Sequence, residues 1–244
     1  MESLNEDQSR RYYDQFSKGY DDKRGGNEPG GYHDLLDDLE VETVKRYGAG
    51  KDVLEVGCGT GLLLARFRDF AKTTRGIDLS PGMLEKAKAR GLDVVEGSAT
   101  SLPFEDKSFD VACSFKVLAH IPDIAMALSE MVRVVRPGGY VIAEFYNPWS
   151  LRYAAKRAAG ARSTSGSFKE DAVYTRFDSP LSVRDRTPAG ARLVATRGIR
   201  IVTPAAFIMN VPVVKTAFRF AEEVLSDTPL KQFAGFYVAI WQRD

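Results

Sequence analysis

The sequence has few of the residues that mark a secreted, metal-binding or membrane-spanning protein. Its 244 residues include two cysteines, Cys58 and Cys113, and two histidines. The cysteines form neither a disulfide framework nor the spacing of metal ligands, so we expect a reducing compartment and no metal site. There is no run of about 18 apolar residues and no signal-like apolar start, which predicts a cytoplasmic chain without a membrane span.

An excess of charge of one sign is also missing. Lysine and arginine total 34, aspartate and glutamate total 33, and the formal net charge is +1. This balance provides no overall electrostatic attraction to a polyanion, so no nucleic-acid partner is expected. A hydrophobic content of 44% over this length can build the core of one large domain, or of a domain with a cap.

The stretch 53–61, Val-Leu-Glu-Val-Gly-Cys-Gly-Thr-Gly, is the most informative part of the chain. Its first four residues have the apolar bias of a buried parallel strand. Glycine at every second position then removes each Cβ that would keep a ligand away from the backbone. Residues 62–67 follow as a mostly apolar helical run, whose first N–H groups would face a bound anionic group such as a carboxylate. The pattern predicts a ligand-binding turn between a strand and a helix.

The spacing of the glycines narrows the choice of ligand. A dinucleotide site has the pattern G-x-G-x-x-G, but here the third glycine comes one residue early, and the Lys-Ser/Thr pair of a phosphate-binding P-loop is absent. Glu55, Gly57, Gly59 and Gly61 instead spell Glu-x-Gly-x-Gly-x-Gly, which resembles motif I of the class I S-adenosylmethionine-dependent methyltransferases. The resemblance implies that these four residues bind S-adenosylmethionine as the cofactor. A glycine-rich turn in another α/β protein is the alternative.

An acidic residue follows the next expected strand, 73–77. Asp78 lies 21 residues beyond Gly57. A carboxylate at the end of a second parallel strand is placed to accept hydrogen bonds from both ribose hydroxyls of an adenosine. By resemblance, Leu79 and Met83 belong to the same cofactor site.

The loop after the third expected strand, 92–96, holds the adenine in related methyltransferases. These enzymes usually carry an aspartate there, whereas this chain has Ser98, whose hydroxyl makes a weaker, neutral hydrogen bond. The resemblance therefore leaves the adenine contact to Ser98 or to the backbone of Ala99. Phe115, directly after the fourth expected strand, 111–114, completes the cofactor site that the resemblance implies.

Two polar residues follow the fourth strand, at the sheet edge where open α/β proteins bind ligands. Lys116 would repel a nearby sulfonium, so we expect its ammonium group to reach the methionine carboxylate or an acidic substrate, or to point into solvent. His120 matches a histidine common in the small-molecule branch of the family, which includes the quinone C-methyltransferases. It is our first candidate for a catalytic base toward an oxygen acceptor, with Tyr146 or Glu144 behind it. The alternative is a histidine that only hydrogen-bonds to backbone.

An aromatic stripe of near-helical spacing lies close to the N-terminus and consists of Tyr12, Tyr13, Phe16 and Tyr20. In similar methyltransferases an N-terminal helix covers the cofactor and contributes an aromatic residue near the methyl group. The resemblance therefore makes Tyr20 a second catalytic candidate, with Phe16 beside it, and ordinary helix packing is the alternative. The glycine-rich residues 25–31 would form a hinge for such a lid.

The chain beyond the fourth strand predicts further sheet and substrate-specific elements. A helix beginning near Asp123 is expected to stop at Pro137-Gly138-Gly139, before a fifth strand over 140–145. The next segment, 147–190, contains a series of cations: Arg152, Lys156, Arg157 and Arg162. They predict either a solvated helix face or a substrate cap with affinity for an anionic acceptor.

The last fifty or so residues, from Arg192 onward, predict a strand, a helix and a strand. The first strand is expected to be kinked at Gly198. Residues 203–214 are apolar but too few to span a membrane, so they would wall an apolar acceptor pocket or complete the core. A helix over 214–225 leads to a final strand over 236–242, which would be antiparallel in the topology of the family.

Together these patterns predict an α/β, Rossmann-like, doubly wound fold with a seven-stranded, mostly parallel sheet. An N-terminal helical lid (1–48) would precede the cofactor-binding core (49–146). An inserted substrate cap (147–190) would follow the fifth strand, and residues 191–244 would complete the same sheet. The close resemblance covers residues 50–146.

The function that the resemblance implies is transfer of the sulfonium methyl group to a small-molecule acceptor, apolar or anionic, by in-line displacement. The enzyme would mainly align the reactants and exclude water. Two other classes stay open, a protein that binds S-adenosylmethionine without turnover and a nucleotide-dependent oxidoreductase. The patterns identify neither the acceptor, nor the methylated atom, nor the oligomeric state.

Overall fold

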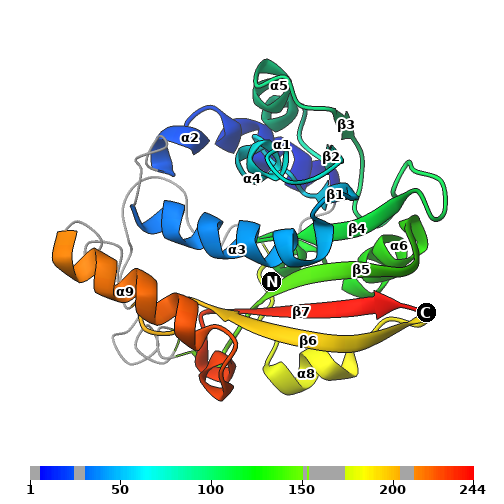
Figure 1. The fold of residues 1–244 in the computed structure, drawn as a ribbon. Helices are drawn as coiled ribbons and strands as arrows, with labels where there is room; N and C mark the ends of the chain where they lie inside the picture. The colour runs from blue at the N-terminus through cyan, green and yellow to red at the C-terminus, as the bar shows by residue number, and fades with distance from the viewer. Residues whose placement is uncertain (1–5, 25–30, 151–152, 154–173, 204–211) are drawn as a thin grey trace.

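The computed structural model describes residues 6–24, 31–150, 153, 174–203 and 212–244. These residues form a seven-stranded sheet in the order β3-β2-β1-β4-β5-β7-β6 (Figure 1). The strands are β1 (Asp52–Val56), β2 (Thr73–Asp78), β3 (Val94–Glu96), β4 (Phe109–Ser114), β5 (Val135–Tyr146), β6 (Ala191–Ile199) and β7 (Phe236–Arg243). Neighbours from β3 to β5 are parallel, whereas β7 runs antiparallel to both β5 and β6. The predicted seven-stranded, mostly parallel α/β sheet is confirmed.

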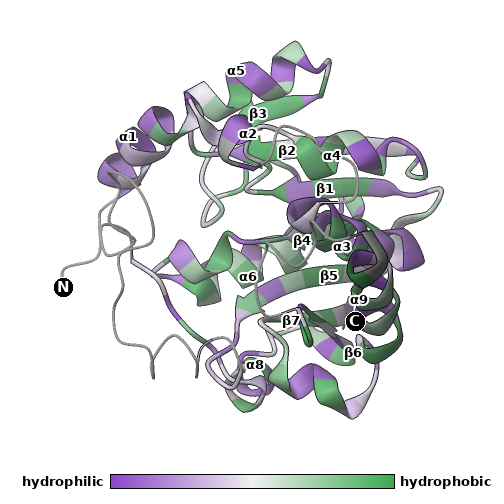
Figure 2. Ribbon diagram, turned by 90° about the vertical axis from the view of Figure 1, so that its left-hand side faces the viewer, coloured by the Kyte–Doolittle hydropathy of each residue, from purple (hydrophilic) through white to green (hydrophobic). Residues whose placement is uncertain are grey.

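Helices cover both faces of this sheet, because adjacent strand residues point to opposite sides. Val53 of β1 joins the apolar core closed by α3 (Tyr32–Gly48) and α4 (Leu62–Phe67). Its neighbour Leu54 joins the core closed by α6 (Ile124–Val134) and α8 (Pro180–Asp185). Figure 2 shows α3 on one side of the sheet and α6 and α8 on the other. The other helices of the described residues are α1 (Glu6–Ser17), α2 (Tyr20–Lys23), α5 (Pro81–Ala89), η1 (Leu118–His120), α9 (Pro212–Leu225) and η4 (Pro229–Phe233).

The strand order creates a crevice at the carboxyl ends of β1 and β4. The chain runs from β1 outward to β2 and β3, then returns to place β4 on the other side of β1. In open α/β sheets, ligands bind where the strand order reverses in this way. The glycine turn after β1, Asp78 at the end of β2 and the loop after β4 all lie at this edge.

The transition from α6 to β5 differs from the predicted one. The helix ends at Val134 and the strand begins at Val135, so the strand already contains Pro137-Gly138-Gly139. Val135 pairs with Phe109, and the next paired residue of β5 is Tyr140, opposite Val111. The Pro-Gly-Gly residues therefore form an irregularity inside the strand, and the prediction that they stop the helix was wrong.

The predicted kink of β6 at Gly198 was also wrong. Gly198 pairs in regular register with Tyr237, and the irregularity of β6 lies between Leu193 and Ala195. A Cβ atom on Gly198 would lie 2.7 Å from the Cα atom of Lys231 in η4. Gly198 is thus required because η4 approaches the strand closely, a contact that the local sequence does not reveal.

The N-terminal residues form two short helices with the predicted aromatic contacts. The ring of Phe16 in α1 stacks on Tyr12 at 5.9 Å and meets the edge of Tyr20 in α2 at 5.5 Å. Residues 25–30 of the predicted hinge, the four cations of the predicted cap and residues 204–211 lie outside the described residues. Within the described ranges, no helix is long and apolar enough to cross a membrane.

Candidate functional site

The turn after β1 has the backbone conformation that its glycines allow. Gly57 and Gly59 have φ angles of 77° and 54°, in the left-handed region. A Cβ atom on Gly57 would lie 2.3 Å from the Val117 side chain, so this glycine lets the loop after β4 approach the turn. A Cβ atom on Gly59 would meet nothing within 4 Å, which leaves its bare backbone open to a ligand.

Asp78 is held rigidly beside this turn. Its Oδ2 atom accepts a hydrogen bond from the Gly59 N–H at 2.8 Å, and its Oδ1 atom accepts one from the Ser80 N–H at 2.9 Å. Burial raises the pKa of Asp78 above its ordinary value, although the backbone N–H groups of Ser80 and Gly59 act against this shift. The carboxylate therefore has a fixed orientation, as a ribose-binding residue requires.

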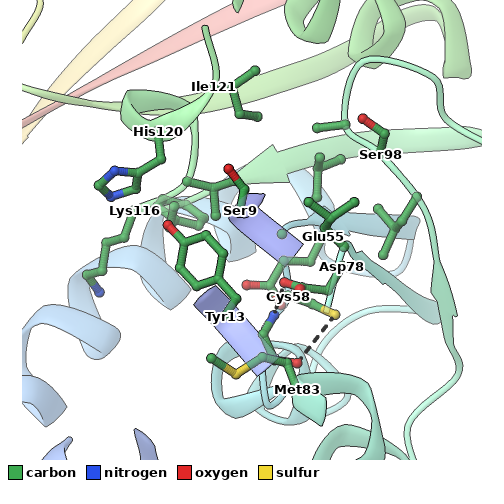
Figure 3. Close-up of a pocket in the computed structure, with 18 of the residues that line it drawn as sticks. Ser9, Tyr13, Glu55, Cys58, Asp78, Met83, Ser98, Lys116, His120 and Ile121 are labelled. Atoms are coloured by element: carbon green, nitrogen blue, oxygen red, sulfur yellow. Dashed lines mark hydrogen bonds between the residues drawn. The ribbon is translucent and has the colours of Figure 1, made fainter. Parts of the chain in front are cut away.

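A single cavity of about 850 Å³ brings the predicted site residues together (Figure 3). All of them except Gly61 line it: Glu55, Gly57, Gly59, Asp78, Leu79, Met83, Ser98, Ala99, Phe115, His120 and Tyr20. Gly61 is the N-cap of α4, with a φ angle of 80°, and packs against Leu92. Among the described residues, no group of His, Cys, Asp and Glu side chains could hold a metal ion.

Glu55 lies in the cavity wall without a full set of partners. It is only 3% exposed, and within the described part of the chain its Oε2 atom has no hydrogen-bond partner. Burial raises the pKa of Glu55 well above its ordinary value. An unpartnered buried carboxyl group of this kind costs free energy unless a ligand supplies a donor or a positive charge.

Ser98 and Ala99 occupy the loop after β3, as predicted for the adenine end. The Ser98 hydroxyl lies 2.8 Å from the Thr100 hydroxyl and 3.3 Å from Oε2 of Glu6 in α1. The Thr100 N–H also donates to Ser98 Oγ, at 3.3 Å. The serine thus organises its own turn, and its role toward adenine stays a prediction.

Tyr13 was not singled out from the sequence, yet it lies in the cavity. In the view of Figure 3 its ring lies between His120 and Lys116 on one side and Glu55 and Asp78 on the other. Burial raises the pKa of Tyr13, so its hydroxyl stays protonated. Tyr13 precedes Phe16 by one helical turn, and this i, i+3 spacing in the aromatic stripe was the available signal.

The Lys116 side chain lines the cavity and is paired with acidic residues of the protein itself. Its ammonium group lies 2.5 Å from Glu40 and 3.5 Å from Asp37, both on α3, and its side chain is 19% exposed. The Lys116 N–H donates to Oε1 of Glu144 at 3.1 Å. Since the ammonium group is already paired within the protein, the expectation that it points into solvent was wrong. The backbone of Lys116 adopts a φ angle of 60°, which is rare for a residue with a side chain.

The carboxyl groups around Lys116 are deeply buried. Glu40 and Glu144 are 0% and 1% exposed, and burial raises the pKa of both above the ordinary value. Glu144 does not line the cavity, so it cannot contact an acceptor directly. Tyr146 does line it, but burial, together with the charge of Glu144, raises the pKa of its hydroxyl. These two residues are therefore poor alternatives to His120 as a proton acceptor.

His120 ends the short helix η1 and has a defined tautomer. Its Nδ1 atom lies 3.0 Å from the backbone carbonyl oxygen of Tyr174, which can only accept, so Nδ1 carries the proton. Nε2 is then the basic nitrogen, and none of the hydrogen bonds among the described residues uses it. Burial lowers the pKa of His120, which keeps the imidazole neutral at pH 7. The predicted contact with backbone exists, and it leaves the ring competent as a base.

Two further cavity residues carry no sequence signal. Arg24 follows α2 and His33 is the second residue of α3, on either side of the glycine-rich segment. The Arg24 guanidinium donates to Asp37 at 2.6 Å, and burial lowers the pKa of His33 to about 4. Arg24 and His33 line the same cavity as Lys116 because the fold brings distant segments together, and local sequence spacing does not indicate this.

Comparison with known proteins finds a family match for the central part of the chain. Residues 54–143 match the family described as "Methyltransferase domain". A demethylmenaquinone methyltransferase of Renibacterium salmoninarum is 40% identical over 102 residues, which are 41% of this chain and 43% of that protein. A phthiotriol/phenolphthiotriol dimycocerosates methyltransferase of Mycobacterium tuberculosis is 44% identical over 98 residues, 37% of this chain and 36% of that protein. The chain thus matches less than half the length of either relative.

Solved structures agree on the fold of almost the whole chain. A methyltransferase of Thermotoga maritima, described as a possible histamine N-methyltransferase, superposes with a TM-score of 0.66 and 21% identity, over 96% of this chain and 99% of that one. A [4+2]-cyclase superposes with a TM-score of 0.69 and 19% identity, over 100% of this chain and 98% of that one. The second comparison shows that the fold alone does not determine the reaction.

The residues present fit S-adenosylmethionine, the cofactor that this family implies. Gly59 offers an open backbone, Asp78 an oriented carboxylate, and Glu55 a buried carboxyl oxygen without a partner, all in one cavity. Gly59 could contact the methionine part of the cofactor, Asp78 its ribose hydroxyls and Glu55 its ammonium group. Residues 54–143 thus match a methyltransferase domain, and the cavity beside them offers groups that suit the cofactor of that family.

Proposed function

We propose that the chain transfers a methyl group from S-adenosylmethionine to a small-molecule acceptor. The observation that carries this proposal is the continuity of the cavity, which extends from Asp78 beside the glycine turn to His120 after β4 and Tyr146 at the end of β5. A cofactor held at the first end would present its reactive part toward the second. When bound, S-adenosylmethionine supplies an electrophilic methyl group on a sulfonium sulfur.

Some residues of the cavity would bind the cofactor, and others would exclude water or accept a proton. Asp78 would accept hydrogen bonds from the ribose hydroxyls, and Glu55 would pair with the ammonium group. Tyr13, Phe16 and Tyr20 line the cavity from the N-terminal helices and would exclude water from it. For an acceptor that must lose a proton, Nε2 of His120 would take that proton.

The proposed division of the chain follows from the positions of these residues. Residues 1–48 would act as the lid, 49–146 as the cofactor-binding core and 147–190 as the substrate cap, with 191–244 completing the sheet. In support, residues 174–178 run beside η1, where the Arg176 N–H donates to the Ala119 carbonyl at 2.8 Å. Part of the proposed cap therefore lies next to His120. Within residues 1–48, α3 packs in the core through its leucines, so α1 and α2 are the helices that would cover the cofactor.

For the acceptor we propose a chemical class and not an individual compound. The names of the curated relatives point to quinone and lipid acceptors, but the matches cover 37% to 51% of this chain. A small molecule with an apolar body is consistent with the aromatic lining by Tyr13, Phe16, Phe115 and Tyr146.

Calorimetric titration with S-adenosylmethionine tests the proposed methyl transfer, and binding at micromolar Kd, about −8 kcal/mol, is expected. Binding of NADH instead would overturn it.

Replacing His120 with glutamine tests the proposed base. For an oxygen acceptor we expect kcat/KM at neutral pH to fall by about 100-fold, since general-base catalysis contributes about that factor or more. The wild-type rate should fall at acid pH as the imidazole is protonated, and this fall should lie below the ordinary histidine pKa because burial lowers the pKa of His120. The measurement is the pH dependence of kcat/KM with radiolabelled cofactor.

The other histidine provides the control for this prediction. His33 also lines the cavity, but its pKa is lowered to about 4, so it stays neutral through the tested range. The His33→Gln variant should keep the acid fall of the wild type at the same pH. If His120→Gln retained the full kcat at every pH, His120 would not be the base.

A further inference from the structure

The N-terminal helices form one wall of the cavity, and two carboxylates attach them to the domain. Ser9, Tyr13 and Phe16 of α1 line the cavity, as does Tyr20 of α2. The attachments are made by Asp14 of α1 and Asp21 of α2. Each of these aspartates contacts one of the two turns that the cofactor is proposed to occupy.

Asp14 binds the turn that follows Asp78. Its Oδ1 atom accepts hydrogen bonds from the Ser80 hydroxyl at 2.6 Å and from the Gly82 N–H at 3.0 Å. The helices approach closely here, because a Cβ atom on Gly82 would lie 2.7 Å from Oγ of Ser17. Asp14 thus adds a negative charge at the N-terminus of α5, where it is favourable.

Asp14 is also connected to the proposed ribose-binding carboxylate. Ser80 donates its hydroxyl hydrogen to Asp14 and its N–H to Oδ1 of Asp78. Ser80 is 0% exposed, so this connection is shielded from water. A displacement of α1 would therefore remove a hydrogen-bond partner from the residue that orients Asp78.

Asp21 binds the glycine turn itself. Its Oδ1 atom accepts the Thr60 hydroxyl at 2.8 Å, and its Oδ2 atom accepts from the Arg90 guanidinium at 2.8 Å. Arg90 also donates to the Thr60 carbonyl at 2.8 Å, which closes a ring of three residues. Burial acts to raise the pKa of Asp21, but the hydrogen bonds from Arg90 and Thr60 outweigh it and lower the pKa, so the carboxylate stays ionised.

We propose that Asp14 and Asp21 are positioning residues that hold the N-terminal helices over the two cofactor-binding turns. The cofactor and its demethylated product can then leave only after these contacts break, so the contacts set the rate of release. This inference rests on the proposed function. Since Thr60 is 1% exposed and lies between Gly59 and Gly61, the contact with Asp21 acts on the cofactor turn directly. The aromatic side chains between the two aspartates then close the cavity only while both contacts are made.

The test measures the dissociation rate of S-adenosylhomocysteine from immobilised protein by surface plasmon resonance. Asp14→Ala and Asp21→Ala should each raise the rate by about ten-fold or more, because each removes hydrogen bonds to a charged group. Asp22→Ala is the matched control, since Asp22 is the exposed neighbour in the same helix, and its rate should equal that of the wild type. Asp21→Glu should recover part of the loss.

A second measurement uses the wild-type chain, so it does not depend on the folding of a variant. Salt screens the partly exposed pair of Asp21 and Arg90, so the dissociation rate of the wild type should rise between low and high NaCl. Equal rates for the wild type and both variants would overturn the positioning role while leaving the proposed function intact. If the wild type bound neither S-adenosylmethionine nor S-adenosylhomocysteine, both proposals would be overturned.

Discussion

Replacing Asp78 with alanine is expected to weaken S-adenosylmethionine binding by at least about 100-fold. A hydrogen bond to a charged group contributes about 1.5–3 kcal/mol, so losing two of them to ribose hydroxyls costs about 3 kcal/mol or more. The substitution also removes the acceptor of the Gly59 N–H, and the cofactor turn loses a constraint. Calorimetry on the two proteins measures the difference directly.

The control for this prediction is another aspartate near the site in sequence. Asp69 is exposed and follows α4, and Asp69→Ala should bind the cofactor as the wild type does. Because burial raises the pKa of Asp78, wild-type affinity should begin to fall at a pH above the usual aspartate range as the carboxylate takes up a proton. An Asp78→Ala variant with unchanged affinity would mean that the ribose is bound elsewhere.

The second large effect concerns stability. Lys116→Met should lower the free energy of unfolding at pH 7 by about 3–5 kcal/mol, the usual result of breaking a buried ion pair. The methionine side chain preserves much of the volume, but Glu40 would lose the ammonium group 2.5 Å away and keep its burial. Urea unfolding of the two proteins measures this loss.

The pH dependence of that loss follows from Glu40. Burial already raises its pKa in the wild type, and removing Lys116 raises it further, so the folded variant holds a proton that the unfolded chain releases. The variant should therefore lose stability as the pH rises above the ordinary glutamate pKa, and approach the wild type at acid pH. Lys72→Met is the control, because Lys72 is 68% exposed and its loss should change stability by less than about 0.5 kcal/mol. A pH-independent loss would point to packing and not to charge.

The parts of the site that the sequence predicted are those encoded by short spacings. The glycine turn and its strand lie within nine residues, and Asp78 follows at the end of the very next strand, so local periodicity places them. His120 also lies shortly after the end of β4, but it became a candidate through the resemblance to a histidine of related methyltransferases. Most strands of the sheet were predictable because they carry an apolar signature, whereas the antiparallel last strand was expected from the topology of the family that the sequence resembles.

The parts that the sequence did not predict depend on pairing between distant residues. Lys116 meets Glu40 and Asp37 only because α3 crosses the sheet opposite the end of β4. Gly198 is needed only because η4 approaches β6, and nothing near it in the chain shows this. The Asp21 contacts with Thr60 and Arg90 join segments far apart in the chain, so charge patterning within one helix gives no indication of them.

The position of β7 has a consequence for how the protein can be made. Strand β7 follows β6 in the chain but lies between β5 and β6 in the sheet (Figure 1). On the ribosome, β5 therefore has an unpaired edge until residues 236–243 have emerged, and β6 has no partner in the sheet before then. Exposed strand edges favour pairing between chains. We therefore expect nascent chains that stall before β7 to be the species most in need of a chaperone.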